Sequence, residues 1–258
     1  MKLYAAFIAA ACAACAPSLA GSASTQGEFY HYVRSNRDGS SPEQIWVYLP
    51  DERSVEVVKI VRKCADAAYV TASLDPVTGS AESLIAGRLA EDGSQSVIGS
   101  MLYDRQARSV SYSLGGPEGP SGEVTGVSPS WHLYDYDMAT LVAQARYRWP
   151  VTMPQSFDMV RLMPNEDGEL VFERLGAVEL EPMPENQGRV SYRTSGDGLR
   201  DGSVERDAGT GTVLRIKSSE RNHLENYDFS LRFVSREAMI GEEWLAKRRS
   251  HWAHCPSG

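Results

Sequence analysis

Short β-prone runs separated by turn residues repeat along most of the chain, and they limit its fold more than any other feature. The joints between runs carry turn chemistry, as in Asp75-Pro76, Asp92-Gly93 and Gly115-Gly116-Pro117. Tight turns connect antiparallel strands, whereas parallel strands need long crossover connections. We therefore predict a mainly β protein of the α+β class, with two helices and a large curved antiparallel meander sheet or open barrel on which a central helix packs.

The β-prone runs fall into two groups, residues 28–127 and 157–234. Apolar and polar residues alternate within them, so that Phe229, Leu231 and Phe233 share one face of a strand and Ser230 and Arg232 the other. Such alternation is typical of a sheet with one buried and one solvated face. We expect the two groups to be sheet halves of a single β-rich domain that covers residues 21–258.

Helical periodicity occurs twice. Residues 137–148 carry apolar side chains at the i, i+3, i+4, i+7 spacing, Asp137 stands where an N-cap belongs, and Pro150 ends the pattern. Residues 241–252 begin with glutamates and end with basic residues, which matches the helix dipole. We predict that the first helix joins the two sheet halves and that the second is a terminal helix.

The first 20 residues have the pattern of a secretory signal peptide rather than of a folded element. Lys2 precedes an apolar run, and Ser18-Leu19-Ala20 offers the small residues that a signal peptidase reads. Alternatively, Cys12 or Cys15 is the lipidated cysteine of a bacterial lipoprotein and provides an N-terminal lipid anchor. No later run is long enough for a transmembrane helix. We expect a periplasmic or secreted protein of a Gram-negative bacterium.

Two cysteines, Cys64 and Cys255, remain after the predicted signal peptide. An even pair of cysteines in an oxidising compartment favours one disulfide. The alternative is two separate buried thiols. We predict the disulfide, because it would fix the end of the chain to the domain.

Charge and motif content exclude several classes of function. The formal net charge of −8 argues against nucleic acid as a partner, since phosphate binding needs a basic surface. After the predicted signal peptide, the sequence contains no GxSxG, HExxH, CxxC or phosphate-binding loop. His251, His254 and Cys255 lie together but lack a second pair of ligands, so we interpret them as a solvated tail. We predict no metal, no cofactor and no catalytic residue.

Aromatic residues gather around the first predicted helix, and a second polar and aromatic group precedes the last strand. They are suited to line a site for an apolar or ring-shaped ligand, and the alternative is ordinary packing of a helix on a sheet. The candidate ligand-binding residues are Trp131, Tyr134, Tyr136, Trp149, His223 and Tyr227.

Two carboxylates, Asp135 and Asp137, stand beside this aromatic group. On an extended strand they would share one face with Trp131, with Tyr134 and Tyr136 on the other, and one of the two would have a raised pKa. The alternative is that Asp137 caps the helix and Asp135 lies in the turn before it.

Three segments carry a resemblance to a known group of proteins. They are YDYDM at Tyr134 to Met138, VERDAGTGTVLRI at Val204 to Ile216, and HLENYDFSLRF at His223 to Phe233, followed by a terminal helix with Trp244. In this order of elements the chain resembles uncharacterised exported bacterial β-rich proteins, over about half its length. The pattern is also similar to the open barrel of lipoprotein localisation factors. That resemblance implies a curved sheet that holds an apolar ligand against a helix, and it transfers no individual functional residue.

Three functions are compatible with these patterns. The first is an exported envelope protein that binds an apolar or lipid-like ligand without catalysis. The second is a structural or interaction subunit of an envelope complex, which would need an exposed apolar patch or sheet edge. The third is a hydrolase acting on an envelope polymer, which would need two titratable side chains within hydrogen-bond reach, such as His223 and Asp228.

Overall fold

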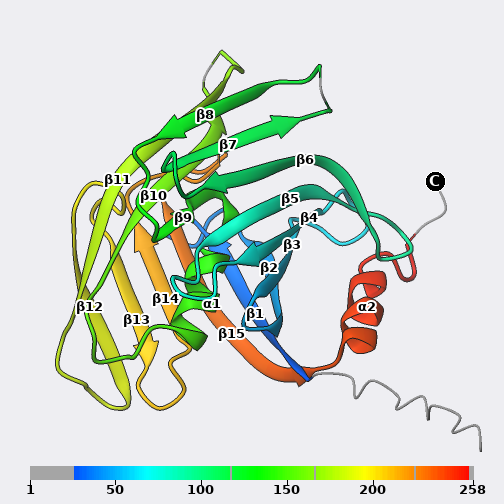
Figure 1. Ribbon diagram of the computed structural model, residues 1–258. Coiled ribbons are helices and arrows are strands. Elements are labelled where there is room, and N and C mark those ends of the chain that lie inside the picture. The colour runs from blue at the N-terminus through cyan, green and yellow to red at the C-terminus, as the bar shows by residue number, and fades with distance from the viewer. Residues whose placement is uncertain (1–25, 117, 166, 224, 256–258) are drawn as a thin grey trace, which may run out of the picture.

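A single sheet of fifteen strands makes up most of the protein. The structure is a computed structural model that describes residues 26–116, 118–165, 167–223 and 225–255. It confirms the predicted class, because the chain is mainly β, has two helices, and forms one large, open, mostly antiparallel curved sheet (Figure 1). The predicted signal peptide, residues 1–20, with Cys12 and Cys15, lies outside the described residues.

Turn residues divide the strands much as the sequence predicts. The strands are β1 (Gly27–Ser35), β2 (Glu43–Asp51), β3 (Ser54–Ile60), β4 (Ala68–Leu74), β5 (Ala81–Leu89), β6 (Gln95–Asp104), β7 (Ser109–Leu114), β8 (Ser121–Thr125), β9 (Trp131–Leu133), β10 (Gln155–Pro164), β11 (Leu170–Pro182), β12 (Arg189–Ser195), β13 (Ser203–Asp207), β14 (Val213–Ser218) and β15 (Phe229–Met239). The helical elements are η1 (Tyr134–Tyr136), a single 3₁₀ turn, and the α-helices α1 (Ala139–Tyr147) and α2 (Gly241–Ser250).

The strand order shows how the two predicted halves meet. From one edge to the other it runs β8 to β1 in descending order, then β15 to β9. Strands β1 and β15, at the two ends of the described chain, therefore pair at the centre of the sheet. All neighbours are antiparallel except β9 and β10. The chain passes from the β8 edge to the β9 edge between residues 125 and 131, so the sheet must curl until its two edges come close.

Helix α1 lies inside this curl and is enclosed by the sheet (Figure 1). Its residues from Ala139 to Ala145 are all buried. A helix covered on every side needs small and apolar residues all round, and ATLVAQA meets this requirement. The helix is shorter than the predicted 137–148, because Asp137 and Met138 both adopt left-handed backbone conformations. The prediction that Asp137 is its N-cap is wrong, and Met138 occupies that position.

The C-terminal end of α1 is held by a buried arginine from β13. Arg206 is fully buried and donates hydrogen bonds to the carbonyl oxygens of Ala145 at 2.5 Å and Trp149 at 3.0 Å. Its guanidinium also lies 4.4 Å from the centroid of the Trp149 ring. The last carbonyls of a helix lack partners within the helix and carry its negative dipole end, so a cation stabilises them.

A second buried polar group ties the middle of α1 to β9. His132 is fully buried, with Nδ1 at 2.7 Å from Thr140 Oγ1 and Nε2 at 3.1 Å from Gln144 Oε1. Burial lowers the pKa of His132 to about 4, opposed by its hydrogen bond with Gln144. The imidazole is therefore neutral at pH 7 and fixes the position of the helix on the sheet edge.

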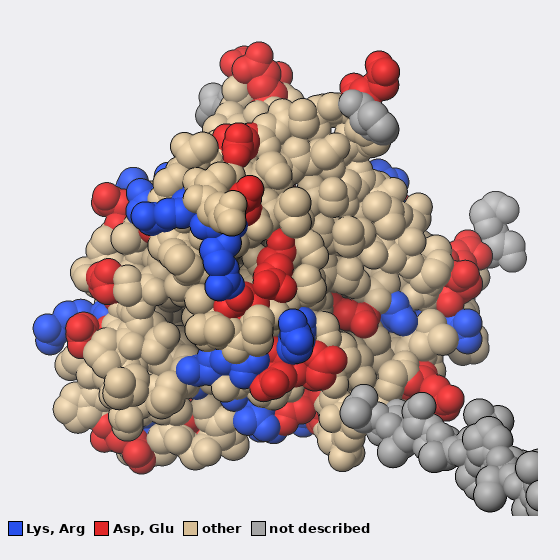
Figure 2. Space-filling view, viewed as in Figure 1, with Lys and Arg blue, Asp and Glu red and all other residues tan. Residues whose placement is uncertain are grey.

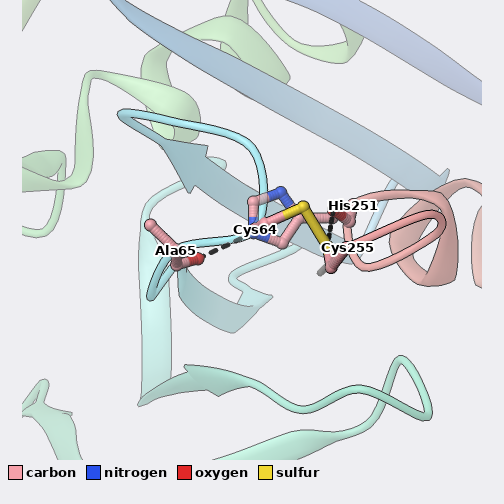
Figure 3. Close-up of a disulfide and its surroundings, with 4 residues drawn as sticks. All are labelled: Cys64, Ala65, His251 and Cys255. Carbon is pink, nitrogen blue, oxygen red and sulfur yellow. Dashed lines mark hydrogen bonds between the residues drawn. A yellow bond between two sulfur atoms is a disulfide. The ribbon is translucent and has the colours of Figure 1, made fainter. Parts of the chain in front are cut away.

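The convex side of the sheet carries α2. Trp244 is buried there, stacked on Tyr48 at 5.3 Å and tilted against Phe29 at 6.0 Å. Beyond α2, Cys255 forms a disulfide with Cys64 in the β3–β4 connection, and His251 lies beside it against the backbone carbonyl of Ala65 (Figure 3). The predicted disulfide is confirmed.

Two strands are longer than local patterns indicate because of the ladders they form. Gly176 does not end a strand: the residues on both sides of it form one strand, β11, because the ladder with β10 absorbs Leu175 as an extra residue. Strand β15 continues past residue 234 to Met239, where it pairs with β1 as far as Gly27. The extension of β15 comes from pairing with β1, a strand distant in sequence, which local patterns do not encode.

Charged side chains of both signs are interspersed on the face seen in Figure 2, with few of them over β5, β6 and β7. Neither α-helix in the described part of the chain has the length and apolar content that crossing a bilayer requires.

Removing the disulfide should reduce stability without changing the fold. It closes a loop of 191 residues in sequence. The entropy lost by the unfolded chain sets an upper value of about 5 kcal/mol for such a loop, and disulfides typically contribute about 2–4 kcal/mol. We expect the double variant Cys64→Ser/Cys255→Ser to lower the free energy of unfolding in urea by this amount. Reducing the native protein should give the same loss, and an unchanged unfolding midpoint would contradict the account.

His132 should make the protein sensitive to mild acid. In the folded protein its pKa of about 4 lies below the ordinary value of 6.5. Its contribution to the free energy of unfolding is therefore fully present above pH 6.5 and is lost as the pH falls from 6.5 towards 4. The loss over this range should be about 3 kcal/mol. In urea unfolding at pH 7, 5.5 and 4, the free energy of unfolding of His132→Asn should depend less on pH than that of the native protein. The same pH dependence in both proteins would contradict this assignment.

Candidate functional site

A hollow of about 140 Å³ opens between the concave face of the sheet and the segment that leads into α1. Most of its wall is apolar and comes from β4, β5, β6, β7, β9 and β10. The lining residues are Lys59, Ala68, Val70, Leu84, Ala86, Ser100, Met101, Leu114, Leu133, Asp135, Tyr136, Leu162 and His223. The strand register places these apolar residues side by side, because Val70 pairs with Ala86 between β4 and β5 and Leu84 pairs with Met101 between β5 and β6.

Three polar side chains, Lys59, Asp135 and His223, form what we call the polar floor of the hollow. The ammonium group of Lys59 lies 3.4 Å from His223 Nε2 and also donates to the backbone oxygen of Asp135. The Asp135 carboxylate accepts a hydrogen bond through Oδ1 from the backbone N–H of Leu162, at 3.2 Å. The polar floor thus joins three distant parts of the chain: β3, η1 and the β14–β15 connection.

Behind the polar floor lies a buried ion network centred on Asp137. Its Oδ2 is 2.7 Å from Lys59 Nζ, and its Oδ1 accepts from the side-chain amide of Asn222 at 2.8 Å. Arg34, buried on β1, lies 3.7 Å from the same carboxylate and pairs with Glu43 at 2.5 Å. Pairing of this kind is what allows charged groups to be buried at all.

The backbone at Asp137 and Met138 is strained. Their φ angles are 52° and 58°, and neither residue is glycine. Each left-handed residue of this kind costs on the order of 1 kcal/mol, and such strain is kept only where the surroundings fix it. Here the buried ion pairs of Asp137 on one side and the enclosed α1 on the other fix the chain between them.

The environment separates the acidities of the two carboxylates. Burial raises the pKa of Asp135 to about 6, opposed by the charge of Lys59. Burial also acts to raise the pKa of Asp137, but the permanent charges of Lys59 and Arg34 outweigh it and hold the pKa below its ordinary value. The predicted arrangement on one strand face is wrong, since β9 ends at residue 133 and a 3₁₀ turn follows.

The histidine of the polar floor is neutral at pH 7. Burial lowers the pKa of His223 to about 4, and the nearby charge of Lys59 adds to the effect. The pair of His223 and Asp228 considered for a hydrolase is not formed, because Asp228 Oδ1 accepts from the backbone N–H of Arg37 at 2.7 Å. The partner of His223 is Lys59, whose charge opposes protonation of the ring.

The structure brings only two of the sequence-predicted site residues, Tyr136 and His223, to the hollow. Trp131 and Tyr134 are buried in the core; Tyr134 donates to the backbone oxygen of Glu220 at 2.7 Å. These two belong to the packing of the helix segment on the sheet.

The other two predicted residues lie elsewhere. Trp149 is buried beneath the Arg206 guanidinium at the far end of α1. Tyr227 is 60% exposed and donates a hydrogen bond to Asp38 at 2.5 Å on the surface. Neither residue lines the hollow.

Sequence analysis missed Lys59 and Arg34, although strand parity marks both. Val55 and Val57 are fully buried, and alternation puts Lys59 on the same face. Arg34 likewise follows the buried Tyr32 by two residues. A charged residue on the apolar side of a strand is a signal for a buried ion network.

Removing a member of the ion network should destabilise the folded protein. We expect Asp137→Ala to lower the free energy of unfolding by about 3–5 kcal/mol, because it leaves Lys59 and Arg34 without their buried partner. As a control, Asp66→Ala removes an exposed pair with Arg88 and should leave urea unfolding unchanged within error. Equal effects of the two substitutions would contradict the network's role.

Comparison with known proteins adds no relative that could name the activity. No protein-family model matches the chain, and no curated protein matches it. The resemblance to lipoprotein localisation factors therefore stays a prediction from the order of elements.

Proposed function

We propose that this protein is a non-catalytic envelope protein that binds a small amphiphile in the hollow. The observation that supports this proposal is the combination of an apolar wall with the polar floor of Lys59, Asp135 and His223. An apolar cleft with a few convergent polar groups is the usual form of a small-molecule site, since the wall supplies affinity and the polar groups orientation.

The size of the hollow narrows the class of ligand. A cavity of about 150 Å³ holds a molecule such as benzene, whereas pockets for drug-sized ligands begin near 300 Å³. At about 140 Å³, the hollow fits a short alkyl chain or one ring with a compact head group. The reason for its small size is that α1 and its buried neighbours fill most of the concave side. A ligand of this size, rather than a whole lipid, is our proposal.

The location in the envelope is supported by the sequence and by the disulfide. The first 20 residues have the pattern of a signal peptide, and Cys64 and Cys255 are oxidised. Disulfides persist in oxidising compartments such as the periplasm. Both observations favour a periplasmic or secreted protein.

One observation favours the second candidate, an interaction subunit. Val97, Ile98 and Leu102 on β6 are 62%, 47% and 59% exposed. Exposed apolar side chains close together are a feature of protein contacts. A complex captured by cross-linking that leaves the hollow empty and requires Leu102 would favour this candidate.

Filling the hollow tests the main proposal. Ala86 lines it, and Ala86→Leu adds three carbon atoms there. We expect the native protein to bind hexanol with a Kd on the order of 0.1–1 mM, as followed by NMR shift changes or calorimetry. Ala86→Leu should lose this binding.

A matched control is Ala238→Leu, because Ala238 is exposed on β15 and is not among the residues that line the hollow. It should bind hexanol as the native protein does, and circular dichroism should show both variants folded. Unchanged binding in a folded Ala86→Leu variant would refute the hollow as the ligand site.

A further inference from the structure

Lys59 in the polar floor and Arg34 behind it are both paired with carboxylates of the protein. The Lys59 ammonium group has three acceptors around it: Asp137 Oδ2, the backbone oxygen of Asp135, and His223 Nε2. The ion pair and the two hydrogen bonds direct the ammonium group towards protein atoms. The hollow therefore presents no free cation to an anionic head group.

The second cation, Arg34, lies behind the polar floor and is equally engaged. Its guanidinium contacts Glu43, Asp137 and Glu225 and donates to Asn222 at 3.0 Å. Two cations thus face the carboxylates of Glu43, Asp135, Asp137 and Glu225, and the surplus of charge around the polar floor is negative. The field in the hollow repels anions and attracts cations.

The free hydrogen-bonding capacity of the polar floor lies on Asp135. Its Oδ1 accepts one bond from the Leu162 N–H, and no other hydrogen bond to its carboxylate is formed within the described ranges. The residue lines the hollow and is only partly buried, so its carboxylate is accessible from the ligand's side. An acceptor oxygen at the end of an apolar cavity favours a ligand that carries a hydrogen-bond donor.

Building on the proposed function, we propose that the hollow selects small amphiphiles with a primary ammonium head, which binds the Asp135 carboxylate while the alkyl chain lies against Val70 and Leu84. Alcohols bind more weakly, through one hydrogen bond. Carboxylates of the same chain length are excluded by the negative charge at the polar floor.

The geometry also makes the selection dependent on pH. Lys59 on β3, Asp137 after η1 and His223 in the β14–β15 connection lie near Asp135. Arg161, next to Leu162 on β10, pairs with two glutamates. The pKa of Asp137 is lowered and that of His223 is about 4. Between pH 7.5 and 5, Asp135, with its pKa of about 6, is the floor group that changes charge.

The test is a calorimetric titration of the full-length protein with hexylamine, hexanol and hexanoate at equal ionic strength. At pH 7.5 we expect hexylamine to bind at least about ten-fold more tightly than hexanoate, and from pH 7.5 to 5 its affinity should fall about ten-fold as Asp135 is protonated. Hexanol binding should stay constant, because a protonated carboxyl group still offers an oxygen to its hydroxyl.

Asp135→Asn keeps the size of the side chain and an oxygen for the Leu162 N–H. It should remove the preference for hexylamine and its pH dependence while hexanol still binds, which also reports that the variant is folded. The control Asp66→Asn, at an exposed pair, should keep the preference.

The outcomes separate this inference from the proposed function. If hexanoate binds as tightly as hexylamine, or if Asp135→Asn keeps the preference, the ammonium assignment is overturned and the hollow remains a ligand site. If none of the three compounds binds the native protein, the proposed function fails as well.

Discussion

The enclosure of α1 inside the curled sheet is the constraint on which the rest of the structure depends. A helix without a solvated face needs partners for the backbone groups at its ends as well as for its side chains. Arg206 supplies cationic donors to the last carbonyls, and His132 fixes the middle of the helix to β9. At the other end, the ion network of Asp137 holds the strained entry into the helix. The sheet can curl around α1 because these polar groups are paired.

The candidate site is a consequence of that arrangement. The backbone enters α1 through two left-handed residues, Asp137 and Met138, which separate η1 from the helix. Between η1 and the small side chains of β4 and β5 a hollow remains, and the ion network becomes its base. The same burial that stabilises the helix raises the pKa of Asp135 and lowers that of His223. The burial of the segment around α1 therefore accounts for both the hollow and the shifted pKa values of its polar groups.

Local patterns were sufficient to predict the architecture but not the site. Turn residues and alternation marked nearly every strand and the antiparallel sheet, because these features depend on short stretches of sequence. The disulfide was predicted separately, from the even pair of cysteines. The hollow depends on side chains from β3, η1 and the β14–β15 connection, which only the strand order brings together. The aromatic residues Trp131, Tyr134 and Trp149 were conspicuous in the sequence, yet they pack the core. Lys59 carried the better signal, a charge on the buried face of a strand.

The most direct test of the account is a crystal structure of the protein with hexylamine bound at pH 7.5. The account predicts electron density for the ligand inside the hollow, with its nitrogen within hydrogen-bond distance of the Asp135 carboxylate and its chain against Leu84. A hollow filled by protein side chains, or a nitrogen directed away from Asp135 towards bulk water, would contradict it.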